Sequence, residues 1–382
     1  MTSKITEFKQ ATNKVKKLGE GSASLVYTDP ENTNMIIKKA AKTRRNANGK
    51  YIKHQITGQN IIKKIRKSGY DYGVNLPEIT DIHGALHIEK AITNKKLQFD
   101  KLNHIKQYLE KNSEHGYLEL TPNQYIKETF LPGVMLHNAE YLKLKDITKD
   151  ELATQLAQFL FAMHNIEKPK SATMQDRMKY ILFNLQFVMQ NAKNPEIIQN
   201  KTMDFINLFR NKQLKQYLFN SSKSLWQDIG EDEVLVMTHG DLRWPNIIYD
   251  KKHTKLGVID FENAGIGHIY RDFVSSPVSF HWDFVQRIIK QYNKIQKAFN
   301  RHFRINTTNV KNLLILRVVN TTIKEIQQEI MQDKSLNIEK ISKQELQTVL
   351  LSKIEPLLLQ ELSEYGLMEK PIIHLSKTRN RN

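Results

Sequence analysis

One stretch in the second half of the chain limits what this sequence can fold into. Residues 238–262 read Thr-His-Gly-Asp-Leu-Arg-Trp-Pro-Asn, then two short apolar runs separated by a polar turn, then Asp-Phe-Glu. Two apolar runs with a turn between them predict a β-hairpin. Such a hairpin would carry Asp241 and Asn246 in the loop before its first strand. It would also bring Asp260, which directly follows its second strand, back beside Asn246.

Three oxygen-bearing side chains in this arrangement suit the transfer of a phosphate group. One carboxylate can orient an attacking hydroxyl and accept its proton, while a second carboxylate and an amide oxygen can hold Mg²⁺ against the phosphates of a nucleotide. The protein then contributes mainly positioning and charge neutralisation. The hairpin therefore predicts a phosphoryl-transfer site, with Mg²⁺ as cofactor and ATP or GTP as phosphate donor.

Two features near the start of the chain favour a nucleotide site. The run Leu-Gly-Glu-Gly-Ser-Ala-Ser contains Gly19 and Gly21, which let the backbone approach phosphate closely. Ser22 belongs to the same loop, and Ser24 stands where a third glycine is usual.

The second feature is the run Met-Ile-Ile-Lys-Lys at residues 35–39. It follows the glycine loop at the spacing of a strand lysine that contacts nucleotide phosphates. Lys38 and Lys39 compete for this role, because neighbouring side chains point to opposite faces of a strand.

The spacing His-Gly-Asp-x-x-x-x-Asn followed by Ile-Asp-Phe-Glu resembles the aminoglycoside phosphotransferase and choline kinase group, within the protein-kinase-like fold. The resemblance implies that Asp241 is the catalytic base and that Asn246 and Asp260 bind magnesium. It also implies that His239 braces the catalytic loop, and we place Arg243 in the same catalytic group.

The resemblance runs in the family's order over residues 16–272. It favours Lys38 over Lys39, because Ile-Ile-Lys-x-Ala is similar to the methylthioribose kinases. The segment Glu-Thr-Phe-Leu-Pro-Gly resembles the hinge between two lobes, where backbone groups of Glu128 and Phe130 would bind the edge of the nucleotide base.

The sequence departs from the family at the partner of the strand lysine. Kinase-like enzymes pair this lysine with a Glu on the following helix, but the helix predicted at 51–68 contains no acidic residue. Gln55 or Gln59 could accept a hydrogen bond from Lys38, or Glu89 could supply a carboxylate from elsewhere. A poorly anchored lysine leaves an alternative open, a nucleotide-binding pseudoenzyme or regulator on a kinase-like scaffold.

The acceptor is expected to be a small molecule with a hydroxyl group. Glycine rather than arginine precedes Asp241, and no Ala-Pro-Glu segment follows Asp260, so the parts with which protein kinases order an activation loop are missing. Glu262, Trp244 and Trp282 are candidates for the acceptor pocket, since a carboxylate with tryptophan rings suits a cationic amine. Amino-alcohol, aminoglycoside and sugar-like acceptors stay open.

The rest of the pattern predicts an α+β protein with a bilobal kinase-like fold, made of a small antiparallel-sheet N-lobe and a larger, mostly helical C-lobe. Apolar runs for the sheet lie at 25–27, 35–37, 79–93 and 117–130. Helices are predicted at 51–68, 97–111, 151–165, 178–190, 202–219, 284–299, 310–331 and 343–365. The expected domains are an N-lobe at 1–130, a C-lobe with the hairpin and acceptor site at 131–370, and a basic tail at 371–382.

The composition narrows the class of protein further. The chain has 382 residues, which suggests about two domains, and no cysteine, which excludes disulfides, thiolate–zinc sites and cysteine nucleophiles. We predict a cytoplasmic protein, because no apolar stretch could span a bilayer and the lysine-rich start lacks a secretory pattern. The net charge is +18, and Asn32 to Tyr70 holds eleven Lys and Arg without an acid. A solvated basic face is favoured, with binding of nucleic acid or another polyanion as the alternative.

Overall fold

The computed structural model describes most of the chain. The described residues are 17–20, 24–29, 32–40, 50–83, 125–184, 195–227, 233–274, 280–332 and 343–368. Several predicted features lie outside them, namely Gly21 and Ser22 of the glycine loop, Glu89, the helix at 97–111 and the basic tail at 371–382.

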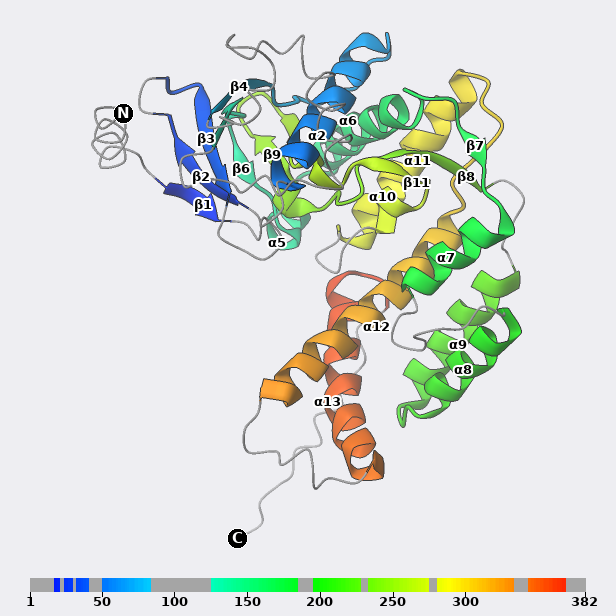
Figure 1. Ribbon diagram of the computed structural model, residues 1–382. Coiled ribbons are helices and arrows are strands. Elements are labelled where there is room, and N and C mark those ends of the chain that lie inside the picture. Colours follow the sequence, from blue (N-terminus) through cyan, green and yellow to red (C-terminus); the bar gives the residue numbers. More distant parts are fainter. Residues whose placement is uncertain are drawn as a thin grey trace, which may run out of the picture. The chain divides into compact units, whose positions relative to one another are not determined.

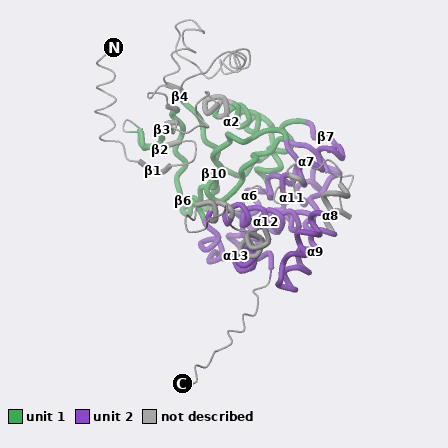
Figure 2. Tube along the Cα trace, turned by 60° about the horizontal axis from the view of Figure 1, so that its bottom comes forward, with its two compact units in different colours: residues 1–136, 158–167, 237–266 green, residues 137–157, 168–236, 267–382 purple. Residues whose placement is uncertain are grey.

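Contacts along the chain divide it into two compact units (Figure 2). The first unit consists of Met1–Leu136, Gln158–Glu167 and Met237–Ile266, and the second of His137–Ala157, Lys168–Val236 and Gly267–Asn382. The hairpin segment, which was predicted to belong to the C-lobe, thus groups with the N-terminal residues by its contacts.

A five-stranded antiparallel sheet in the order β1-β2-β3-β5-β4 forms one part of the first unit (Figure 1). Its strands are β1 (Lys17–Glu20), β2 (Ser24–Thr28), β3 (Met35–Ala40), β4 (Ile79–His83) and β5 (Tyr125–Thr129). The predicted small antiparallel sheet is therefore present. Glu20 pairs with Leu25, so the glycine-loop sequence connects β1 to β2.

Helix α2 (Lys50–Lys67) forms where a helical repeat of isoleucines was noted. Ile61, Ile62 and Ile65 are buried, and the last turn carries basic side chains that favour a helix C-terminus. Gly58 lies on α2 where a Cβ atom would come within 2.7 Å of the Phe261 side chain. Glycine is required here because α2 approaches the segment after the predicted hairpin so closely.

The predicted hairpin forms a second, three-stranded sheet in the order β10-β9-β6. Strands β9 (Ile247–Asp250) and β10 (Lys255–Val258) pair antiparallel, and β6 (Val134–Met135) adds to β9. Asn75 donates its N–H to the Leu256 oxygen at 2.7 Å and accepts from the Val258 N–H at 3.0 Å. These backbone bonds explain why the hairpin belongs to the same unit as the N-terminal segment.

The second unit is mostly helical. Its elements are α5 (Asn138–Leu142), α6 (Asp146–His164), β7 (Lys170–Ser171), α7 (Met174–Asn184), α8 (Pro195–Asn207), α9 (Lys212–Gln227), β8 (Val234–Thr238), β11 (Gly265–His268), α10 (Arg271–Val274), α11 (Trp282–Ala298), α12 (Thr307–Gln332) and α13 (Lys343–Glu364). Three of these elements, α6, β8 and β11, also contribute residues to the first unit. None of the described helices is long and apolar enough to cross a membrane.

One predicted helix is wrong. The segment 202–219 was expected to be continuous, but α8 ends at Asn207 and α9 begins at Lys212. The Asn211 side-chain oxygen accepts a hydrogen bond from the Leu214 N–H at 2.9 Å. This N-cap starts a new helix, and an apolar repeat alone did not reveal it.

Candidate functional site

The loop between β8 and β9 holds the predicted catalytic residues close together. The Arg243 Nε donates to the Asp241 Oδ2 at 3.1 Å. The Asn246 Nδ2 donates to the same oxygen at 3.1 Å and to the Asp241 backbone oxygen at 2.8 Å. The 3₁₀ turn η3 (Trp244–Asn246) brings Asn246 back to Asp241. Because both bonds use the amide nitrogen, the Asn246 Oδ1 stays directed away from Asp241.

His239 connects this loop to the end of β10. Its ring is fully buried, its Nδ1 accepts from the Asp241 N–H at 3.4 Å, and its Nε2 lies 3.0 Å from the Ile259 oxygen. An accepting Nδ1 requires the proton to be on Nε2, which then donates to Ile259. The imidazole therefore ties the backbone of Asp241 to the residue that precedes Asp260.

Asp260 has a left-handed backbone conformation, with φ 67° and ψ 60°. A non-glycine residue adopts this conformation at a cost of about 1–3 kcal/mol, and such residues cluster at functional sites. The conformation is held on both sides: the Ile259 N–H bonds to the Asn246 oxygen at 3.0 Å, and η4 (Phe261–Asn263) begins directly after Asp260. Within the described part of the chain, its carboxylate makes no hydrogen bond or ion pair.

The electrostatic environment of Asp241 raises its pKa, which suits a proton acceptor. Burial raises the pKa of Asp241 above its ordinary value, and the charge of Asp260 adds to this shift. The charge of Arg243 and the hydrogen bond from Asn246 oppose the shift without reversing it. A carboxylate with a raised pKa is a stronger base when it is ionised.

Lys38 is bound to a carboxylate inside the five-stranded sheet. Its Nζ lies 2.9 Å from the Glu128 Oε1, and the two side chains are only 8% and 4% exposed. Ile36 pairs with Glu128 and Lys38 pairs with Ile126, so the lysine and the glutamate lie diagonally on one face of β3 and β5. The side chain of Lys39 lies outside the described residues.

The sequence around this site matches the model of a known phosphotransferase family. The model of the phosphotransferase enzyme family APH matches residues 114–304, which is half of the chain and includes the hairpin of β9 and β10. The chain belongs to this phosphotransferase family. Its membership supports a phosphotransferase that acts on a small molecule.

Solved structures support the same fold. The GDP and kanamycin complex of APH(2")-IIia is 14% identical, has a TM-score of 0.52, and is matched over 95% of this chain and 99% of that one. The GDP complex of wild-type aminoglycoside 2'-phosphotransferase-IIIa is also 14% identical, has a TM-score of 0.50, and is matched over 94% of this chain and 99% of that one. No curated protein matches the sequence. The bilobal kinase-like α+β fold expected from the sequence is confirmed.

Glu128 was expected to bind the nucleotide base through its backbone, but it lies within the sheet. On β5 it is flanked by β3 on one edge and β4 on the other, with Ile36 and Ile79 as its cross-strand partners. Its backbone therefore faces neighbouring strands rather than a ligand, while its side chain binds Lys38. Phe130 is 41% exposed, and its N–H already donates to the Asn34 oxygen at 2.7 Å. Its N–H is therefore already used, while its carbonyl accepts no hydrogen bond within the part of the chain that the structure describes.

The two glutamines of α2 that were predicted as substitutes for the family's helix glutamate do not take its place. The Gln59 side-chain oxygen accepts a hydrogen bond from the Ile79 N–H at 3.1 Å. Gln55 is buried and makes no hydrogen bond within the described residues. Of the glycine-loop residues, Gly19 pairs with Val26 and Ser24 with Ala40, as part of β1 and β2.

The acceptor candidates fall into different environments. Glu262 is half-buried in η4, two residues after Asp260. Trp244 is only 1% exposed and presents almost no surface to a ligand, so we do not carry it into the acceptor proposal. Trp282 belongs to the second compact unit, is 7% exposed, and lies with the Lys311 Nζ 6.0 Å from its ring centre.

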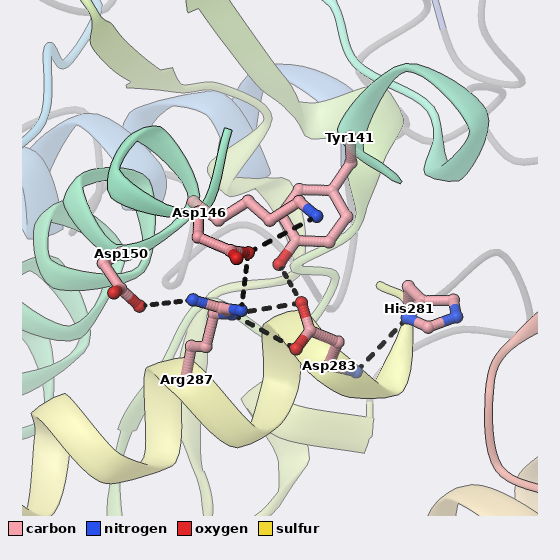
Figure 3. Close-up of polar contacts among 7 residues, drawn as sticks. Tyr141, Asp146, Asp150, His281, Asp283 and Arg287 are labelled. Carbon is pink, nitrogen blue, oxygen red and sulfur yellow. Dashed lines mark hydrogen bonds and ion pairs between the residues drawn. The ribbon is translucent and has the colours of Figure 1, made fainter. Parts of the chain in front are cut away.

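A network of charges in the second unit connects α6 with the helix that begins at Trp282. In Figure 3 the carboxylates of Asp146, Asp150 and Asp283 converge on Arg287, with nitrogen–oxygen distances of 3.0, 2.7 and 3.1 Å. The buried Tyr141 hydroxyl donates to the Asp283 Oδ2 at 2.7 Å. Burial would raise the pKa of Asp283, but the bonds from Tyr141 and Arg287 outweigh it and lower this pKa. We interpret the network as a structural support for α11.

Replacing Arg287 with methionine should lower the free energy of unfolding by about 1–2 kcal/mol, between the values for exposed ion pairs and for charge-assisted hydrogen bonds. A lowered carboxylate pKa contributes stability at neutral pH that is lost as the pH falls below its ordinary value of 3.8. The stability deficit of the variant relative to the wild type should therefore be full at neutral pH and shrink as the pH falls below 3.8, where the wild type loses the same contribution. Urea unfolding between pH 3 and 7 measures this, with Lys290→Met, an exposed lysine of the same helix, as the control. Equal losses in both variants would contradict a specific network.

Proposed function

We propose that the protein is a kinase that transfers the terminal phosphate of Mg·ATP or Mg·GTP to a hydroxyl group of a small molecule. The observation that carries the proposal is the hairpin, because it gathers Asp241, Asn246 and Asp260 within one loop system of a phosphotransferase-family chain. The anchored Lys38 lies in the same compact unit.

Asp241 is the proposed base for the acceptor hydroxyl. Arg243 and Asn246 both bond to its Oδ2, so these contacts hold the carboxylate in one orientation and leave Oδ1 to accept the proton. Once the hydroxyl has lost its proton to Asp241, its oxygen can form a bond to the terminal phosphorus while the bond to the leaving diphosphate breaks. His239 supports this by fixing the backbone of Asp241.

Asn246 and Asp260 fit a magnesium ion by the chemistry of their donor atoms. The Asn246 Oδ1 and the Asp260 carboxylate are oxygen ligands without hydrogen-bond partners among the described residues. No group of three or more His, Cys, Asp or Glu in the described ranges could hold a metal by itself. Such a sparse set suits Mg²⁺, which is commonly bound through one or two side chains together with phosphates and water. When bound, the ion would neutralise phosphate charge.

The donor and the acceptor are open to direct comparison. Both structures compared above contain GDP, which supports testing GTP beside ATP. One of them contains kanamycin, which supports including an aminoglycoside among the acceptors with amino alcohols and sugars. The pseudoenzyme alternative rested on an unanchored lysine, and the Lys38–Glu128 pair removes that reason.

Mg·nucleotide should raise the melting temperature of the wild type by roughly 5–10 °C. Ligand at about 100 times its dissociation constant adds roughly 2.7 kcal/mol, and about 1 kcal/mol moves a domain of 150–250 residues by about 2–4 °C. Asp260→Ala should lose the magnesium-dependent part of this shift, whereas Glu151→Ala, an exposed carboxylate on α6, should keep it. Thermal scans with ATP, GTP and each nucleotide plus EDTA measure this. A wild type that responds to neither nucleotide would overturn the proposed function.

A further inference from the structure

The carboxylate that anchors Lys38 comes from an unexpected element. In kinase-like enzymes the strand lysine is paired with a glutamate of the following helix. Here α2 contains no acidic residue along its whole length, Lys50–Lys67. The 2.9 Å contact with Glu128 instead joins two neighbouring strands of one sheet, and both side chains are almost completely buried.

We propose that Glu128 is the positioning residue of the phosphate-contacting lysine, in place of the helix glutamate. The inference rests on the proposed function and adds a role that the hinge resemblance did not assign to this residue. A buried ammonium group needs an opposite charge close by, and Glu128 supplies it. An ammonium group has three donors, so it can bond to a carboxylate and to a phosphate oxygen at the same time.

The sheet, rather than the packing of a helix, sets the distance between the two groups. Lys38 is opposite Ile126 and Glu128 is opposite Ile36, so the ladder between β3 and β5 fixes their diagonal contact. In a protein with a helix glutamate, a shift of the helix separates the pair. In this chain α2 can move without breaking it, and its polar residues Gln55 and Gln59 are therefore not expected to control the lysine.

A comparison of nucleoside and nucleotide affinities shows whether Glu128 positions Lys38 or only stabilises the sheet. Glu128→Gln keeps the shape of the side chain and removes its charge, so Lys38 loses its orientation. We expect the affinity for ATP or GTP to fall about tenfold, the size typical of removing a group that orients a binding residue, while the affinity for adenosine or guanosine stays unchanged. The turnover number with a transferable acceptor should fall as well. Calorimetric titration of each nucleoside and its triphosphate measures the difference.

Two further variants keep the experiment decisive. Glu128→Asp retains a charge on a shorter side chain and should restore part of the triphosphate affinity, and it serves alone if Glu128→Gln does not fold. Gln55→Ala, on α2, is the matched control and should bind both ligands like the wild type. Equal triphosphate affinity in Glu128→Gln and the wild type would overturn the inference, as would an equal loss for nucleoside and triphosphate. A wild type that binds no nucleotide would instead overturn the proposed function.

Discussion

Asparagine in place of Asp241 should reduce the turnover number of phosphate transfer by about 10²–10⁴-fold, the range in which a positioned proton acceptor contributes. The variant should still fold, because an amide oxygen can accept the bond that the Arg243 Nε makes to Asp241. Nucleotide affinity should change little, because Asp241 is not one of the two proposed magnesium ligands. The loss therefore concerns the chemical step rather than binding.

The pH dependence of the turnover number identifies the group that is responsible. Burial raises the pKa of Asp241 above its ordinary value of 3.8, so the base becomes protonated at a higher pH than a solvated aspartate. The wild type should lose turnover as the pH falls through this raised pKa, and Asp241→Asn should lack that limb. Asp250→Asn is the control, since Asp250 lies on the same hairpin and bonds to its turn through Lys252 and His253. Unchanged turnover in Asp241→Asn would contradict its role as base.

Local patterns were sufficient to predict the hairpin, the helix α2 and the strands β3 and β5. The spacing between Asp241 and Asn246 fits a loop that folds back on itself, and the observed bonds between them span only five residues. The isoleucine repeat of α2 and the alternating runs of β3 and β5 are likewise signals within single elements. Each of these predictions depended on residues that are near one another in the sequence.

The partner of Lys38 could not be predicted in the same way, because it depends on strand pairing. Lys38 and Glu128 are 90 positions apart in the sequence, and the register between β3 and β5 brings them together. One local signal was available. Glu128 lies two residues after Ile126 on β5, so its carboxylate points to the same face of the sheet as a buried apolar residue. A charged residue in that position needs a partner. The family resemblance indicates α2 instead, because kinase-like enzymes carry the glutamate on that helix.

The burial of Trp244 could not be predicted from the sequence either. A tryptophan next to a catalytic loop fits both a ligand contact and a core position, and composition does not separate them. The 3₁₀ turn η3 decides the matter, since it directs the ring into the interior, where 1% of its surface stays exposed.

Lys38→Met should lower the free energy of unfolding by roughly 3–5 kcal/mol, which is the cost of leaving a buried charge without its partner. The methionine fills a similar volume, so the loss comes mainly from Glu128, which remains 4% exposed beside an apolar side chain. The double variant Lys38→Met/Glu128→Leu removes both charges and should regain most of the lost stability, because apolar residues often replace a buried ion pair without cost. Urea unfolding of the two single variants and the double variant gives the coupling energy between the positions.

A second lysine–glutamate pair in the same unit provides the matched control. The Lys64 Nζ lies 2.6 Å from the Glu167 Oε1, closer than the 2.9 Å of the Lys38 pair, but its side chains are 53% and 39% exposed. Lys64→Met should therefore cost at most about 1 kcal/mol, since solvent screens an exposed pair and accepts the remaining charge. If the two methionine variants lost the same stability, Glu128 would have access to water or another cation once Lys38 is gone. A larger loss of stability in Lys38→Met than in Lys64→Met would show that burial, rather than the nitrogen–oxygen distance, makes Lys38 and Glu128 depend on each other.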